Sequence, residues 1–111
     1  MTTQVDVLIN AKDAENSQTT QYTSTSVQTI IDKFTVHNHT GTAATFACNL
    51  VPSGGSADST NLFVNRTILP GETYRCPELV GQTLDDGDLI STIAGTATAL
   101  AMRASGRIIS S

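Results

Sequence analysis

The sequence predicts an all-β domain, built as an antiparallel β-sandwich or barrel of about eight short strands. Three observations lead to this fold class. Apolar and polar residues alternate in short runs, turn-forming residues recur about every eight to twelve positions, and no stretch has a helical period. Thr and Ser make up about a quarter of the chain, and β-branched Thr suits the half-exposed face of a strand.

Length and charge narrow the range of functions. A chain of 111 residues forms one domain with a thin core and little room for a deep enclosed pocket. The six basic residues are scattered and the net charge is −4, whereas a protein that binds a nucleic-acid backbone needs clustered Lys and Arg. Because large apolar residues are few and Trp is absent, we expect contacts with other subunits to supplement the core.

The first strand is expected over Gln4–Ile9, and three apolar side chains share one of its faces: Val5, Val7 and Ile9. The next segment, Ala11–Ser26, is polar and predicts a loop with one weak or edge strand near Thr19–Thr23. Its composition also fits a mobile arm, since it offers little apolar surface to bury. We therefore expect an N-terminal segment or arm with one strand at 1–26 and a β-sandwich domain at 27–111.

Two strong strands follow, over Val27–Asn38 and Ala43–Val51, and the Gly-containing turn at 39–42 predicts that they form a hairpin. The residues expected to face inward are Ile30, Phe34 and Val36 in the first strand and Ala44, Phe46, Cys48 and Leu50 in the second. Asp32 interrupts the inward row and indicates a bulge or the start of the strand.

Further elements follow the glycine-rich loop Pro52–Ser59. They are strands at Asn61–Leu69 and Thr73–Cys76, a single helical turn at Pro77–Gly81, and strands at Leu89–Ala94 and Ala97–Ile109. Reversals are expected at Leu69–Glu72 and Asp85–Asp88, because Pro presets φ and Gly accepts a positive φ. The expected core is small: Val5, Phe34, Val36, Phe46, Leu50, Leu62, Val64, Leu89, Ile93, Leu100 and Met102.

Three carboxylates crowd into the Asp85–Asp88 turn: Asp85, Asp86 and Asp88. Such a turn could supply oxygen ligands to Ca²⁺, which takes six to eight of them, but the spacing of an EF-hand loop is missing. The interpretation we prefer is an acidic β-turn whose Asp side chains cap backbone N–H groups.

Other patterns have a chemical and a structural interpretation. His37 and His39 could share a metal ion, but no third ligand is evident, so we interpret them as surface residues of a turn. Ser53 is the best candidate nucleophile, yet no His and acid accompany it. Asn38 and Asn65 begin matches to the N-glycosylation pattern, which arise by chance in a Thr-rich chain. We therefore expect no catalytic, metal-binding or cofactor-binding residues.

The two cysteines, Cys48 and Cys76, are too few for a disulfide framework. The start of the chain has neither the basic nor the apolar segment of a secretion signal, and no apolar run approaches the length of a membrane span. We therefore expect both thiols to be reduced and buried as small apolar side chains.

Four runs of the chain carry a resemblance to a known class of protein: Ile30–Val36, Asn49–Gly55, Ile68–Tyr74 and Leu84–Ser91. They resemble small virion proteins of tailed bacteriophages, over about Val27 to Ile109. The resemblance implies a β-sandwich or jelly-roll-like subunit that assembles with copies of itself on a phage particle. It carries over no catalytic residues and no cofactor.

The function that this resemblance implies is that of a non-enzymatic virion structural protein. We expect a capsid decoration or cement protein, assembled in the cytoplasm of the host bacterium as a homo-oligomer, with a trimer as the first expectation. Its partners would be its own copies and the major capsid protein or other virion proteins, without nucleic acid or membrane. The alternatives are a neck, collar or tail component, or a carbohydrate-binding β-sandwich. The last is disfavoured because sugar platforms stack on aromatic rings, and Tyr22 and Tyr74 are the only tyrosines.

Overall fold

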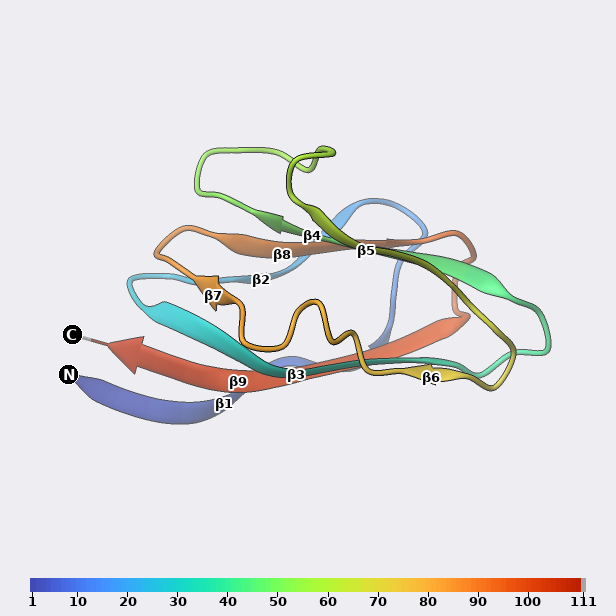
Figure 1. The fold of residues 1–111 in the computed structure, drawn as a ribbon, viewed down its shortest axis with the longest axis horizontal. Helices are drawn as coiled ribbons and strands as arrows, with labels where there is room; N and C mark the ends of the chain where they lie inside the picture. The colour runs from blue at the N-terminus through green and yellow to red at the C-terminus, as the bar shows by residue number, and fades with distance from the viewer. Residues whose placement is uncertain (111) are drawn as a thin grey trace.

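The computed structural model describes residues 1–110, which form nine strands and no helix. The strands lie in two antiparallel sheets that pack face to face (Figure 1). The expected fold class, an all-β antiparallel sandwich, is therefore confirmed. The molecule is elongated, with principal extents of 46 × 26 × 19 Å.

The two sheets differ in their number of strands. Sheet A has five, β1 (Thr2–Asp13), β9 (Leu100–Ser110), β3 (Gln28–Asn38), β6 (Thr73–Tyr74) and β7 (Thr83–Leu84), in the order β1-β9-β3-β6 with β7 also paired to β3. Sheet B has four, β2 (Thr19–Thr23), β8 (Leu89–Ala94), β4 (Ala44–Val51) and β5 (Leu62–Ile68), in the order β2-β8-β4-β5.

The order of the strands is that of a jelly roll. Pairing is nested along the chain: β4 pairs with β5, β3 with β6 and β7, β2 with β8, and β1 with β9, and successive pairs alternate between the sheets. The short strands β6 and β7 lie along one edge of β3 and together take the place of a single strand. Counted in this way the sandwich has the eight strands of a double-sheet jelly roll.

Apolar side chains from both sheets fill the space between them. The rings of Phe34 on β3 and Phe46 on β4 are fully buried with centroids 6.1 Å apart. Between β6 and β7 the chain leaves the edge of sheet A and buries Cys76 and Leu79. The single helical turn expected at Pro77–Gly81 is here a pair of overlapping turns, closed by N–H bonds from Leu79 and Val80.

The predicted inward face of β1 is right at Ile9 and wrong at Val5 and Val7. Val5 is 80 % exposed and Val7 is 39 % exposed, whereas Leu8 and Ile9 are both buried. The cause is a bulge: Val7 pairs with Ser105 and Ile9 with Ala104, so that Leu8 is an extra residue. A bulge changes which side chains face the core, and a strict alternation therefore fails across it.

Another bulge lies in β3, where Asp32 had indicated one. Ile31 pairs with Gly106 and Lys33 with Ser105, which leaves Asp32 as the extra residue. Before the bulge Ile31 faces the core instead of the expected Ile30, and after it Phe34 and Val36 face inward as expected. The core expected in β8 is also corrected: Ile90 is buried, while Leu89 and Ile93 are half-buried on the opposite face.

The predicted hairpin between β3 and β4 is wrong, because the two strands lie in different sheets. Both edges of β3 are occupied, one by β9 and the other by β6 and β7. The connection is held by the buried side chain of Asn38, whose Nδ2 donates to the carbonyls of Thr42 at 2.9 Å and Ile68 at 3.0 Å. By contrast, the turn at Leu69–Glu72 is present, with Gly71 at φ 73°.

The N-terminal segment contributes two strands, which match the strand expected at Gln4–Ile9 and the weak or edge strand expected near Thr19–Thr23. β1 forms the outer edge of sheet A beside β9, and β2 forms the outer edge of sheet B beside β8. The structure therefore builds residues 1–26 into both sheets of the sandwich, and the boundary expected after residue 26 falls in the connection between β2 and β3.

Candidate functional site

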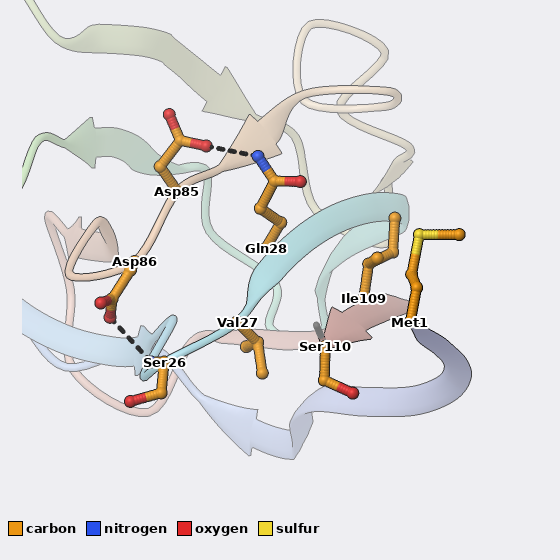
Figure 2. A pocket seen from close by; sticks show the side chains of 8 residues that line it. All are labelled: Met1, Ser26, Val27, Gln28, Asp85, Asp86, Ile109 and Ser110. Atoms are coloured by element: carbon orange, nitrogen blue, oxygen red, sulfur yellow. Dashed lines mark hydrogen bonds between the residues drawn. The ribbon is translucent and has the colours of Figure 1, made fainter.

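An open hollow of about 660 Å³ lies at the end of the sandwich where the first and last strands meet the acidic turn (Figure 2). Its lining residues are Met1, Ser26, Val27, Gln28, Asp85, Asp86, Ile109 and Ser110. On one side Asp85 Oδ1 accepts a hydrogen bond from Gln28 Nε2 at 2.9 Å, and Asp86 Oδ1 accepts one from the N–H of Ser26 at 2.7 Å. Both acids that face the hollow are thus already engaged.

The acidic turn acts as a clamp on neighbouring loops. Asp88 Oδ1 accepts the N–H of Ser53 at 2.9 Å, and its Oδ2 accepts the N–H of Asp85 at 2.9 Å. The turn is closed by the Asp88 N–H, which donates to the carbonyl of Asp85. Together with the Asp86–Ser26 contact, these bonds confirm the interpretation of an acidic turn whose side chains cap backbone N–H groups. Within residues 1–110 no three acids, histidines and cysteines lie together as a metal-binding group.

Gly87 fits this clamp for two reasons. Its φ of 91° lies in the left-handed region, where only Gly is unstrained. A side-chain carbon at this position would also lie 2.7 Å from Ser53 Cβ, which is closer than real contacts allow. The N–H of Gly87 donates to the carbonyl of Ser24, so the turn is tied to the β2–β3 connection as well as to the loop after β4.

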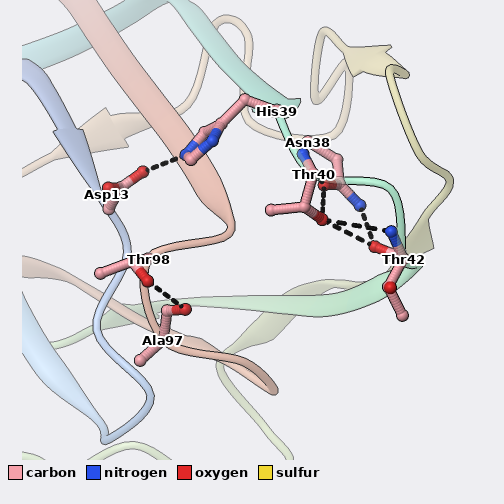
Figure 3. Close-up of polar contacts among 7 residues, drawn as sticks. All are labelled: Asp13, Asn38, His39, Thr40, Thr42, Ala97 and Thr98. Atoms are coloured by element: carbon pink, nitrogen blue, oxygen red, sulfur yellow. Dashed lines mark hydrogen bonds and ion pairs between the residues drawn. The ribbon is translucent and has the colours of Figure 1, made fainter.

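The two histidines have separate partners. His39 Nε2 lies 2.7 Å from Asp13 Oδ1, at the end of β1, and this pair is half-exposed (Figure 3). His37 Nδ1 instead lies 2.8 Å from Thr73 Oγ1 on β6. The interpretation of the two histidines as structural surface residues fits this arrangement better than a shared metal does.

The glycosylation-like pattern at Asn38 begins with a buried side chain. Asn38 is fully buried, and besides its two donated bonds its Oδ1 accepts the N–H of Thr40 at 2.9 Å (Figure 3). The folded protein therefore closes this side chain to modification. Asn65, by contrast, is exposed on β5, the outer strand of sheet B.

The cysteines are both free and buried, as expected. Burial raises the pKa of the Cys48 thiol far above its usual range and raises the pKa of the Cys76 thiol to about 12. Both side chains therefore stay protonated at neutral pH, which is the unreactive form of a thiol. Ser53 lies on the exposed loop after β4, where its backbone N–H binds Asp88.

One polar cluster escaped the sequence analysis. The guanidinium of Arg66 lies over the ring of Tyr74, with its carbon 4.3 Å from the ring centroid. The Tyr74 hydroxyl donates to Glu78, 2.6 Å from Oε2. Burial and this hydrogen bond to Glu78 raise the pKa of Tyr74. The only signal in the sequence was the placement of Arg66 and Tyr74 on either side of the Leu69–Glu72 turn.

A second unexpected feature is a bidentate ion pair on the outside of sheet A. Arg107 on β9 donates from Nε and Nη2 to the carboxylate of Asp32, with distances of 2.9–3.2 Å. The bulge places Asp32 on this outer side, and the hydrogen bond to Asp32 raises the pKa of Arg107. The residue that interrupted the pattern of the sequence thus has a partner on the neighbouring strand.

Comparison with known proteins finds no matching family model, curated protein or solved structure. In the described part of the chain, no helix is long and apolar enough to cross a membrane.

The feature that offers most for an interaction is the first half of β1. β1 is the outermost strand of sheet A, so within residues 1–110 one of its edges has no neighbouring strand. All side chains from Met1 to Val7 are exposed, and the apolar ones among them are Met1, Val5 and Val7. An exposed strand edge is a template for pairing with another chain.

Proposed function

We propose that this protein is a non-enzymatic structural component of a bacteriophage particle, and specifically a decoration or cement protein on the capsid. Its partners are copies of itself and the major capsid protein, and it is assembled in the cytoplasm of the host bacterium. The proposal is supported by the jelly-roll order of the strands, which recurs in viral capsid domains. Because jelly rolls also serve other functions, the fold raises the expectation by analogy alone.

The observation that carries the proposal is the open edge of β1. A monomeric protein usually protects such an edge with charges, Pro or a covering loop. Here the stretch Thr2–Val7 has one charged side chain, Asp6, and presents Val5 with 80 % of its surface exposed. A surface of this kind suits a protein that works in contact with other subunits.

The resemblance also covers a neck, collar or tail component, which would use the same edge in a different assembly. A carbohydrate-binding module is supported less well. The ring of Tyr74 is already covered by Arg66, and the hydroxyl of Tyr22 is bonded to Thr29 Oγ1 at 2.8 Å. The Tyr22 ring is also partly buried against the core, so neither tyrosine offers an open ring on which a sugar could stack.

Immunogold electron microscopy of particles from the source phage tests the proposal. Antibodies raised against the recombinant chain should label intact heads at regular positions, and particles treated with pre-immune serum should stay unlabelled. Labelling confined to the neck or tail would replace the decoration protein by the alternative virion role. Particles without any label, together with binding of the purified chain on a glycan array, would overturn the virion proposal in favour of a sugar-binding module.

A further inference from the structure

The free edge of β1 has a definite set of hydrogen-bonding groups. The N–H of Ala14 donates to the carbonyl of Leu100, and the N–H of His39 donates to the carbonyl of Ala99. The backbone N–H and C=O groups of successive residues in a strand point to opposite neighbouring strands. Along β9, the backbone groups of even-numbered residues therefore bond to β1 and those of odd-numbered residues bond to β3.

This alternation identifies the outward-facing groups of β1. Its partners Ser110, Ile108 and Gly106 are even-numbered residues of β9, so Thr2, Gln4 and Asp6 bond to β9. The backbone N–H and C=O groups of the residues between them then point to solvent: those of Thr3, Val5 and Val7. An independent contact agrees, because the N–H of Val7 donates to the Asp6 carboxylate at 2.9 Å and is not used in the sheet.

We propose that Thr2–Val7 pairs antiparallel with the same segment of a second copy, about a two-fold axis at Val5. In this register Val5 lies opposite Val5, Thr3 opposite Val7, and Gln4 opposite Asp6. The three outward-facing residues of each copy then form hydrogen-bonded pairs with those of the other. The contact joins two five-stranded sheets edge to edge into one sheet.

The side chains select this register over its neighbours. Opposite residues of an antiparallel pair lie on the same face and interact directly. Centring the contact on Val5 pairs two exposed β-branched apolar side chains and places the Gln4 amide opposite the Asp6 carboxylate. Centring it on Asp6 would bring two carboxylates together, which is destabilising. Centring it on Gln4 would leave Val5 opposite Thr3.

The interface ends where β1 bends. The bulge at Leu8 turns the following residues into the sandwich, and Leu8 and Ile9 are buried there. On pairing, the N–H of Val7 exchanges the Asp6 carboxylate for the carbonyl of Thr3 in the second copy. The Asp6 carboxylate is then released to accept the Gln4 amide across the axis. The Asp6 carboxylate thus accepts the N–H of Val7 in the monomer and the amide of Gln4 from the second copy in the dimer.

The β1 contact supplies the surface for the self-association in the proposed function, on which it rests. A two-fold contact makes a dimer in place of the trimer expected from the sequence. Whether the chain dimerises in solution and whether antibodies label phage heads are separate observations, so failure of one is distinguishable from failure of the other.

Sedimentation equilibrium of the full chain over a range of concentrations tests the dimer. Val5→Pro removes an N–H that points to solvent and spares the bonds to β9, since Pro is tolerated at such edge positions. Val5→Lys places two like charges opposite each other. Both should weaken dimerisation at least about tenfold, which corresponds to about 1.4 kcal/mol. Val80→Lys, at an apolar residue that is 50 % exposed on a turn, is the matched control and should leave the dimer unchanged.

The register is tested by oxidative cross-linking. Val5→Cys should form an intermolecular disulfide, because only residue 5 lies opposite itself, at a Cα separation suited to a disulfide. Val7→Cys alone should not, while a mixture of Thr3→Cys and Val7→Cys should. Cys48 and Cys76 are buried and leave the background low. Circular dichroism verifies that each variant folds, and Val5→Lys carries the test if Val5→Pro does not fold.

Three results would overturn the proposal: a wild-type chain that stays monomeric at the highest concentration, a trimer that persists in Val5→Lys, or Val7→Cys cross-linking as fast as Val5→Cys.

Discussion

The acidic turn lines the hollow together with Met1, the residue that precedes β1, yet the turn and the first half of β1 use their polar groups in opposite ways (Figure 2). In the turn, Asp85, Asp86 and Asp88 all accept hydrogen bonds from the same chain. Along Thr2–Val7, one edge of the backbone bonds to β9 and the other faces solvent.

This difference shows that a cluster of reactive or charged residues in a sequence is a poor guide to where a protein binds its partners. Three crowded carboxylates suggest a binding site, but here they hold the chain's own loops. A short alternation of polar and apolar residues suggests an ordinary strand, but here it leaves an edge open. The decisive property is which hydrogen-bonding groups remain unused after folding, because these must find water or another chain.

Replacement of Gly87 should have the largest effect on stability. Gly87→Ala combines a side chain at φ 91° with a clash against Ser53, and we expect a loss of about 3 kcal/mol in the free energy of unfolding. Gly54 also has a positive φ, of 78°, but has open space around it, so Gly54→Ala should cost only about 1 kcal/mol. Urea denaturation measures both; equal losses would show that the clamp imposes no constraint beyond backbone strain.

One aspartate from each region should differ in its contribution to stability. Asp88→Ala removes the charged acceptor of two exposed hydrogen bonds, from the N–H groups of Ser53 and Asp85, and should cost about 1.5 kcal/mol because these bonds hold two loops to the turn. Asp6→Ala removes only an exposed contact with the adjacent Val7 N–H and should change monomer stability by no more than about 0.5 kcal/mol. These values are to be read from urea midpoints at a concentration where the protein is monomeric. A larger loss for Asp6→Ala would contradict the distinction between the regions.

The two buried cysteines should make the stability of the folded protein depend on pH in the alkaline range. The pKa of Cys76 rises from 9.0 to about 12 on folding, and burial also raises the pKa of Cys48. Between pH 9 and about pH 12 the Cys76 thiol is protonated in the folded state and largely deprotonated in the unfolded state. The free energy of unfolding must therefore fall as pH rises through this range. The stabilisation is complete below about pH 9 and is lost toward about pH 12. Urea midpoints across this range should show the decline, and Cys76→Ala should flatten it; an unchanged slope would contradict burial of Cys76.

The smallest effect is expected at Val5 itself. Val5→Thr retains the β-branched shape and replaces a side chain that is 80 % exposed in the monomer, so monomer stability should stay within about 0.5 kcal/mol. Thermal unfolding at low concentration measures this value. A large loss would show that Val5 supports the monomer and is not reserved for a partner.

Much of the fold could be predicted from the sequence because strands and turns are local. The turns at Leu69–Glu72 and Asp85–Asp88 lie where Pro, Gly and Asp placed them, and β8 (Leu89–Ala94) has the expected bounds. The choice of sheet is not local. The run from Val27 to Val51 has the pattern of a hairpin, but β3 and β4 lie in different sheets, and both edges of β3 are already occupied.

The faces of the strands were predictable only up to each bulge. Asp32 signalled its bulge because a charge interrupted an apolar row, whereas the bulge at Leu8 lies within the unbroken run Val7–Ile9 and gave no signal. The open edge of β1 was missed for the same reason. Because the bulge at Leu8 was not predicted, Val5 was assigned to the core, and β1 then offered no exposed apolar side chain to a partner. The contact between Arg66 and Tyr74 was equally hidden, since it joins strands of different sheets.

The pairing of the first strand with the last has a consequence for synthesis of the protein on the ribosome. β1 is made before the other eight strands described, and its neighbour in sheet A is β9, which is made after them (Figure 1). Until Leu100–Ser110 has emerged, both edges of β1 are open, and such contacts between distant segments form slowly. A nascent chain halted before Leu100 should therefore be cleaved readily within residues 2–13, and protection of β1 should appear only with β9.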